Sequence, residues 1–136
     1  MSHEEVITSF YEAGGPVADD SVLERTFSDD YVSHNSPPEA PPGVGQAFGL
    51  KGFLNAAFSD VDYKLTRTVI EGDMAATYTT ISAVHTGDAL GFPATNEPFT
   101  VEQMHMLRFD SDGKIVEHWG IRDDAGMMRQ IGMIPA

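Results

Sequence analysis

The sequence has no cysteine in its 136 residues. A disulfide framework, a thiolate zinc site and a cysteine nucleophile are therefore excluded. Basic residues are also scarce, because eight Lys and Arg stand against 21 Asp and Glu, giving a formal net charge of -13. Nucleic acids and anionic membranes attract basic patches, so this charge argues against either as a partner.

Long apolar runs are missing as well. No run approaches the roughly 18 apolar residues that a membrane-spanning helix needs. The N-terminus also lacks a basic segment followed by an apolar one, the pattern of a signal peptide. We therefore expect a cytoplasmic protein. With 41% hydrophobic residues in a chain of this length, we expect one globular domain over residues 1–136.

The hydrophobic pattern predicts helices first and strands afterwards. Ser2 and Glu5 have the spacing of a capping box, and apolar residues then recur at helical spacing after Ser2, after Asp19 and over 46–58. A short extended segment is expected over 31–35. Beyond Asp60 the pattern predicts strands over 61–69, 74–85, 99–109 and 114–122, then a short helix from about Asp123. This order predicts an α+β fold, with N-terminal helices packed on one face of an antiparallel sheet.

Two acids, Asp123 and Asp124, stand where the last strand gives way to the helix. Either acid can cap the helix start, and that structural role would explain both. Strand alternation, however, places Trp119 and Asp123 on one face. A carboxyl group beside an indole is desolvated, which raises its pKa towards the range useful for general acid/base chemistry. We therefore predict Asp123 as the acid/base residue and Asp124 as the helix-start residue.

The strand over 99–109 has two mixed faces. One face carries Gln103 and His105 among apolar residues, and the other carries Arg108 with Met104 and Met106. A mixed face can line a pocket, or it can be solvated or lie in an interface. The hairpin turn at 110–113 brings this strand beside Trp119, but alternation does not decide which face points inward.

His34 and His85 each stand near the end of an extended segment. Together with His105 they supply three side chains of a type that binds metal ions. No His-x-His or His-x-x-x-His spacing supports a metal site, so we expect no metal. The Gly-x-Ser-x-Gly turn of serine hydrolases is absent. Single histidines of this kind are more typical of surface or hydrogen-bonded positions than of catalysis.

A set of short motifs occurs in a fixed order along the chain. These are Glu71-Gly72-Asp73, His85-Thr86-Gly87, Gly91-Phe92-Pro93-Ala94-Thr95, Arg108-Phe109, Asp112-Gly113-Lys114-Ile115, Glu117-His118-Trp119, and Asp123 followed by Met127-Met128-Arg129-Gln130-Ile131-Gly132. Together they resemble the SnoaL-like polyketide cyclase (ester cyclase) family over roughly residues 31–132. The resemblance implies an NTF2-like cone, in which helices close over a curved antiparallel sheet and enclose an apolar pocket.

The resemblance also implies a reaction. In polyketide cyclases of this family, an aspartate just after the final long strand acts as general acid/base in an intramolecular aldol closure that needs neither metal nor cofactor. By motif position this aspartate corresponds to Asp123, with Trp119 as a pocket wall. Polar residues on the neighbouring strand help to hold the enolate; Gln103 and His105 are candidates on one face, and Met106 and Arg108 on the other.

We therefore expect a cofactor-independent, cyclase-like enzyme that abstracts a proton from a small, hydrophobic carbonyl compound. Asp123 and His105 are the predicted catalytic residues. The predicted substrate-binding residues are Trp119, Gln103, His34, Arg108 and His85. The fold implied by the resemblance also predicts a homodimer through the outer face of the sheet.

Two other functions fit the same fold. One is a non-catalytic domain that binds a small molecule. The other is an epoxide hydrolase, which needs an Asp–Arg–Asp arrangement around a water molecule. Arg67 or Arg108 with Asp123 could supply part of that arrangement. The position of Asp123 relative to a pocket separates these alternatives.

Overall fold

A computed structural model describes residues 1–135 of the chain. Its helices are α1 (His3–Glu12), the short 3-10 helix η1 (Gly15–Val17), α2 (Asp20–Thr26), α3 (Gly45–Ala57) and α4 (Asp124–Gln130). Its strands are β1 (Phe27–Ser33), β2 (Phe58–Glu71), β3 (Met74–His85), β4 (Pro98–Phe109) and β5 (Ile115–Arg122). None of the helices in this range is long and apolar enough to cross a membrane.

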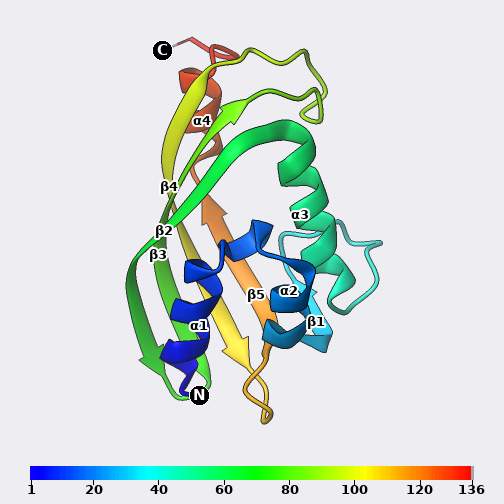
Figure 1. Ribbon diagram of the computed structural model, residues 1–136, viewed down its shortest axis with the longest axis vertical. Coiled ribbons are helices and arrows are strands. Elements are labelled where there is room, and N and C mark those ends of the chain that lie inside the picture. Colours follow the sequence, from blue (N-terminus) through cyan, green and yellow to red (C-terminus); the bar gives the residue numbers. More distant parts are fainter. Residues whose placement is uncertain (136) are drawn as a thin grey trace.

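The five strands form one sheet in the order β1-β5-β4-β3-β2. Strands β2 to β5 form an antiparallel meander, and β1 pairs with β5 in parallel at the edge. Helices α1, α2 and α3 lie on one side of the sheet, and α4 lies at its far end (Figure 1). The predicted α+β fold is confirmed. The parallel strand β1 is longer than the short extended segment expected over 31–35.

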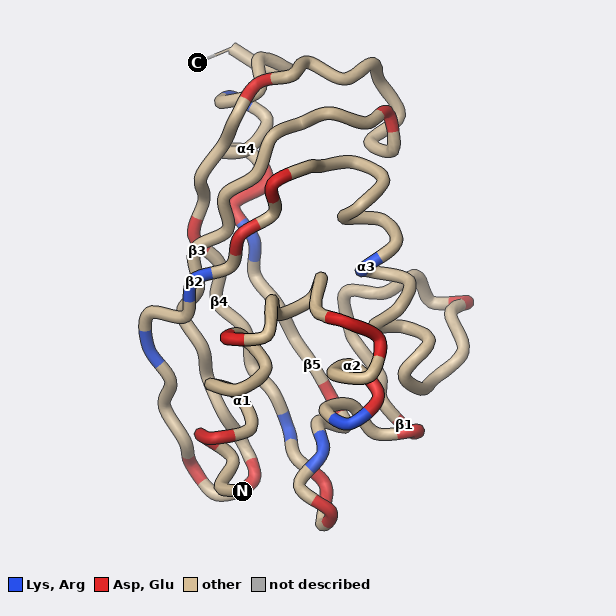
Figure 2. The backbone as a smooth tube through the Cα atoms, in the orientation of Figure 1, with Lys and Arg blue, Asp and Glu red and all other residues tan. Residues whose placement is uncertain are grey.

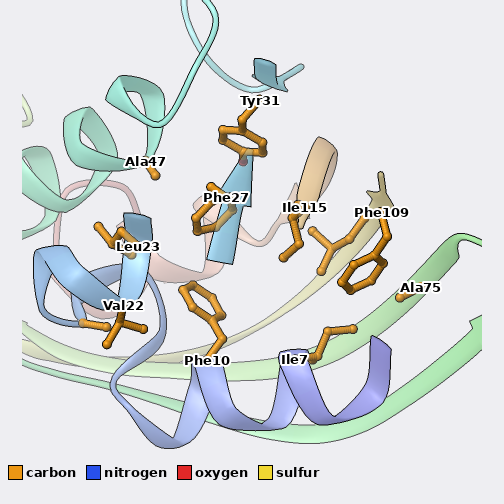
Figure 3. Close-up of a cluster of buried hydrophobic side chains, with 12 residues drawn as sticks. Ile7, Phe10, Val22, Leu23, Phe27, Tyr31, Ala47, Ala75, Phe109 and Ile115 are labelled. Atoms are coloured by element: carbon orange, nitrogen blue, oxygen red, sulfur yellow. The ribbon is translucent and has the colours of Figure 1, made fainter. Parts of the chain in front are cut away.

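Helix α1 begins as the sequence predicts. The Ser2 hydroxyl accepts a hydrogen bond from the Glu5 backbone N–H, and the Glu5 carboxylate accepts one from the Ser2 N–H, at 3.1 and 3.0 Å. Ile7 and Phe10 on the apolar face of α1 are buried in a cluster with α2, β1 and the paired ends of β4 and β5 (Figure 3). Each such side chain contributes about 1.5–3 kcal/mol through removal from water.

A second apolar cluster holds the other end of the molecule together. It joins Leu54 and Phe58 at the junction of α3 and β2 to Ile81, Phe99 and the C-terminal Ile131. The two clusters leave a cavity between them, because the helices cover the curved sheet without filling its concave side.

Strand β5 contains one extra residue relative to its partner β4. Arg108 pairs with Glu117, but the next residue, Phe109, pairs with Ile115, so Val116 is a β-bulge. A one-residue slip moves every following side chain to the other face of a sheet. Ile115 therefore points inward, and beyond the bulge the even-numbered residues of β5 do so.

Acidic residues are spread along most of the elements, although α3 and β3 contain none (Figure 2). The high negative charge therefore acts on the whole surface, where it favours solubility. It does not mark a single binding face.

Two glycines differ sharply in the space around them. A methyl group on Gly87 would lie 1.7 Å from the carbonyl oxygen of Ala56, because the chain after β3 crosses directly over the end of α3. A methyl group on Gly49, inside α3, would meet nothing within 4 Å. Gly49 therefore weakens the helix without a packing reason.

We expect Gly87→Ala and Gly49→Ala to change stability in opposite directions. Gly87→Ala pushes the chain after β3 away from the end of α3 and should lower the free energy of unfolding by about 1–3 kcal/mol. Gly49→Ala should raise it by about 0.5–1 kcal/mol through helix propensity. Urea unfolding followed by circular dichroism measures both. Equal effects of the two substitutions would contradict the close crossing at Gly87.

Candidate functional site

A cavity of about 500 Å³ lies between the concave face of the sheet and the helices. Its volume is within the range of small-molecule sites. Most of its wall is apolar and comes from both hydrophobic clusters. Helix α3, the loop over 86–97 and helix α4 border it with Leu50, Phe53, Leu90, Phe92, Met127 and Met128. This lining suits a hydrophobic molecule that carries a few polar groups.

One wall of the cavity is polar, and its four side chains form a continuous hydrogen-bonded row. We call it the polar row: Ser33, His118, His105 and Gln103. The Ser33 hydroxyl lies 2.7 Å from Nδ1 of His118. Nε2 of His118 lies 2.8 Å from Nδ1 of His105, whose Nε2 lies 3.0 Å from Oε1 of Gln103. The row therefore runs from the end of β1 across the middle of β5 to the middle of β4.

Burial keeps both histidines of the polar row neutral. Burial, and then the nearby Arg122 charge, lowers the pKa of His105 to about 4. Burial lowers the pKa of His118 to about 3, and His105, His34 and Arg122 add to this effect. At neutral pH each ring therefore has one N–H and one lone pair, and each can both donate and accept a hydrogen bond.

Gly120 makes the contact between the two histidines possible. It pairs with His105 across β4 and β5. A methyl group at this position would lie 2.9 Å from Nδ1 of His105 and 3.1 Å from the ring of His118. Any larger residue would push the rings apart, so the missing side chain is part of the site.

The mouth of the cavity carries an ion pair. Arg122 and Asp124 both line the cavity, and a guanidinium nitrogen lies 3.3 Å from the Asp124 carboxylate. Both side chains are about half exposed, so the pair itself contributes little stability. Within residues 1–135, Arg122 is the single cationic side chain of the lining. It lies directly across from Gln103 in the sheet.

Three tyrosines complete the polar groups of the lining: Tyr11, Tyr31 and Tyr63. Burial raises the pKa of Tyr11 to about 12 and raises the pKa of Tyr31 and Tyr63 further. All three therefore remain protonated phenols at neutral pH. They can donate hydrogen bonds to a ligand, but they cannot act as bases.

The structure brings two of the predicted substrate-side residues together in the cavity. Gln103 and His105 both line it and are hydrogen-bonded to each other. Alternation in the sequence did not decide which face of β4 points inward. The structure shows that it is the face carrying Gln103 and His105. Met104, Met106 and Arg108 lie on the opposite face of the sheet.

Trp119 lies on the outer face, and its predicted position as a pocket wall is wrong. The bulge at Val116 reverses the side of β5 on which Trp119 would otherwise lie. The indole stacks on the ring of His34, with ring centroids 4.9 Å apart. His34 and Arg108 both bind the Glu117 carboxylate, at 2.7 and 2.8 Å. These predicted substrate contacts therefore form a separate cluster outside the cavity.

The positions predicted for Asp123 and Asp124 are reversed in the structure, since Asp123 is at the helix start and Asp124 is at the cavity. The Asp123 carboxylate accepts a hydrogen bond from the Gly126 N–H at 2.8 Å and caps α4. It folds so closely over Gly126 that a methyl group there would lie 2.2 Å from it. Asp123 is exposed and does not line the cavity, whereas Asp124 does. The expected desolvation of Asp123 beside Trp119 is therefore not found, because that face of β5 points outward.

His85 is fully buried behind the cavity wall and does not line it. Its Nδ1 accepts the Thr95 N–H at 3.2 Å and lies 3.0 Å from the Thr95 hydroxyl. Its ring packs edge-on against Phe58 and Phe92, which do line the cavity. The placement fits a structural histidine that anchors the loop over 86–97. Across the described range, no three or more His, Cys, Asp or Glu side chains are grouped to hold a metal ion.

Comparison with known proteins agrees with this architecture. The family model described as SnoaL-like polyketide cyclase matches residues 5–131. The chain belongs to the SnoaL-like polyketide cyclase family. Among its relatives, nogalonic acid methyl ester cyclase of Streptomyces nogalater is 35% identical over 85 residues, which span 61% of this chain and 62% of that protein.

Solved structures of two other proteins superpose along nearly the whole chain. IdmH of Streptomyces antibioticus, described as a putative polyketide cyclase, has a TM-score of 0.80 and 30% identity, covering 97% of this chain and 99% of that one. A Catenulispora acidiphila protein with a ketosteroid isomerase-like fold has a TM-score of 0.75 and 20% identity, covering 96% and 94% of the two chains. The second likeness concerns the fold alone.

Sequence reasoning missed several side chains of this SnoaL-like cavity: Ser33, His118, Arg122 and Asp124. His118 and Arg122 were missed because strict alternation from Ile115 assigns them to the outer face. The adjacent apolar residues Ile115 and Val116 gave the one available signal, since two consecutive apolar residues at a strand start are compatible with a bulge. Ser33 was missed because it pairs with β5 across 85 positions of the sequence.

The neutral histidines predict a pH-dependent stability. Both pKa values are lower in the folded protein than the ordinary histidine value of 6.5, so the unfolded chain binds more protons below about pH 6.5. Stability should therefore fall as pH drops from 6.5 towards 4, by up to about 1.4 kcal/mol per pH unit for each histidine.

We expect this loss to be smaller in His105→Asn and in His118→Asn. Between pH 7 and 5, each substitution should remove about 2 kcal/mol of the pH dependence. Urea unfolding of wild type and both variants at a series of pH values measures it. If the free energy of unfolding fell equally with pH in all three proteins, the folded rings would protonate as readily as the unfolded ones, which would contradict the prediction.

Proposed function

We propose that this protein is a cofactor-independent, cyclase-like enzyme that acts on a small carbonyl compound. The reaction would be an aldol-type ring closure, or a related abstraction of a proton next to a carbonyl group. The single observation that carries the proposal is the polar row inside a mostly apolar cavity. The names of relatives support it, since nogalonic acid methyl ester cyclase and two aklanonic acid methyl ester cyclases match parts of the chain.

The arrangement supplies donors for the oxygen of an enolate. The amide nitrogen of Gln103 and the guanidinium of Arg122 belong to residues directly opposite each other on β4 and β5, on the concave face. Directly opposite residues have Cβ atoms about 5 Å apart. A carbonyl oxygen placed between them would be stabilised as negative charge develops. Fixed donors in a water-poor cavity are more effective than the same donors in water.

The acid/base role is assigned here to the polar row. Its two histidines face the cavity and hold exchangeable protons, whereas the Asp123 carboxylate is occupied with the N-terminus of α4. The family resemblance still gives Asp123 that role, so the two assignments compete. Asparagine caps a helix about as well as aspartate. Asp123→Asn therefore removes the acid/base capacity of the residue and keeps its structural contribution.

We expect the protein to speed the exchange of the benzylic hydrogens of benzyl phenyl ketone in deuterium oxide, measured by proton NMR. Gln103→Leu and His105→Asn should lower the rate by about 100-fold, the usual size of an acid/base contribution. Asp123→Asn should stay within about threefold of wild type. A 100-fold loss in Asp123→Asn with activity kept in His105→Asn would return the role to Asp123.

The same measurement tests the remaining alternatives. A domain that only binds small molecules would bind the ketone, with chemical-shift changes in the cavity, and leave its exchange rate at that of buffer. The epoxide hydrolase alternative loses support from the geometry, because Arg67 and Arg108 do not line the cavity and Asp123 caps α4.

We also propose that the protein is a homodimer through the outer face of the sheet. Exposed apolar side chains gather there in two cross-strand rows. Val69, Met106 and Trp119 share one row, and Met104 and Ile121 share the next. Ile121 is 78% exposed and Met104 is 54% exposed. A second copy would remove this apolar face from water.

We expect wild type to elute as a dimer in size-exclusion chromatography with light scattering. Ile121→Glu places a charge in the middle of the face and should shift the protein to monomer. The control is Leu50→Glu, because Leu50 is similarly apolar and exposed but lies on α3 at the cavity. A monomeric wild type, or equal effects of both substitutions, would count against this interface.

A further inference from the structure

The hydrogen bonds of the polar row restrict where its protons can be. When Gln103 presents its carbonyl oxygen to His105, Nε2 of His105 must donate. The unprotonated Nδ1 of His105 then accepts from Nε2 of His118. Nδ1 of His118 in turn accepts from the Ser33 hydroxyl, whose oxygen accepts the Asn35 backbone N–H. Every bond in this arrangement points from Ser33 towards Gln103.

The opposite arrangement satisfies the same three contacts between the four side chains. A carboxamide presents either its oxygen or its NH₂ group when it turns over. With the NH₂ group donating to Nε2 of His105, that ring must carry its proton on Nδ1. His118 then also carries its proton on Nδ1 and donates to Ser33. Mixed arrangements would put two donors or two lone pairs against each other, so the two rings are coupled.

We propose that the polar row is a proton relay with two opposite directions, which takes up a proton from the substrate at the Gln103 end and releases one at the Ser33 end. The relay deepens the proposed cyclase function, on which its substrate step rests. Ser33 and His118 thereby join Gln103 and His105 as functional residues.

The step converts a ketone to its enolate without charging any side chain. The carbon next to the carbonyl gives its proton to Nε2 of His105, where the substrate takes the place of the Gln103 amide. The proton on Nδ1 of His105 moves to Nε2 of His118. The proton on Nδ1 of His118 moves to the Ser33 oxygen, and the Ser33 proton passes to a base in the solvent. The electron pair of the broken C–H bond forms the C=C bond, and the C=O π pair becomes a lone pair of the enolate oxygen, whose negative charge faces Arg122.

The geometry explains why histidines that resist protonation can still move protons. Each ring gains one proton and loses another in the same event, so neither has to become a cation inside the cavity. Gly120 is the position that holds the two rings in contact. A methyl group there would separate them without removing any polar group.

The test reads the proton positions directly, by ¹⁵N NMR of the imidazole nitrogens at pH 7 and without any substrate. Gln103→Glu offers an acceptor when ionised, and Gln103→Arg offers donors alone. We expect both rings to carry their proton on Nε2 in Gln103→Glu and on Nδ1 in Gln103→Arg. His118 is the decisive reporter, because it is hydrogen-bonded to His105 and Ser33 and to neither substituted side chain.

Gly120→Ala is the matched control for coupling. When Gly120→Ala is added to either Gln103 variant, the proton position on His105 should still depend on residue 103. The proton position on His118 should no longer depend on it. Three results would overturn the relay: His118 holding the same proton in both Gln103 variants, the two rings of wild type holding protons on opposite nitrogens, or either ring of wild type being doubly protonated.

The exchange of benzyl phenyl ketone separates this inference from the proposed function. If the relay operates in catalysis, Ser33→Ala and Gly120→Ala should each lower the exchange rate about 100-fold while the KM changes little. If NMR shows that the two rings are coupled but the protein does not speed hydrogen exchange of the ketone, the proposed function is refuted and the relay stands. Exchange at the wild-type rate in Ser33→Ala would refute the relay's catalytic step and keep the proposed function.

Discussion

One extra residue in β5, Val116, decides what the cavity contains. Without this bulge, Glu117, Trp119 and Ile121 would follow Ile115 onto the concave face. With it, His118, Gly120 and Arg122 are placed opposite Leu107, His105 and Gln103. The polar row, the mouth ion pair and the apolar outer face all depend on this change of parity. A bulge of this kind redirects side chains while the strands stay paired.

The two ends of the molecule have different tasks. The cluster around Ile7, Phe10 and Phe109 is closely packed and holds the helices on the sheet. The other end is built from α3, with its glycines, and the loop over 86–97 that His85 anchors. The first end therefore fixes the helices on the sheet, and the second end closes the cavity with α3 and an anchored loop.

Local features were predictable, and the ones that depend on pairing were not. The capping box of Ser2 and Glu5 and the order of helices and strands follow from neighbouring residues, and the structure has them. The face of β5 depends on how it pairs with β4, and the adjacent apolar residues Ile115 and Val116 are compatible with a bulge without requiring one. Gln103 and His105 were found because β4 alternates without interruption, whereas Asp123 was placed on the wrong side by counting through a bulge.

The single tryptophan of the chain stacks on His34 outside the cavity. Its intrinsic fluorescence therefore reports on the outer face of the sheet. Because the indole is on the face of the sheet opposite the cavity, a ligand that fills the cavity would leave this emission nearly unchanged. Contact with a second copy at the outer face would alter it. A silent fluorescence titration with a candidate substrate would thus say nothing about whether the substrate binds.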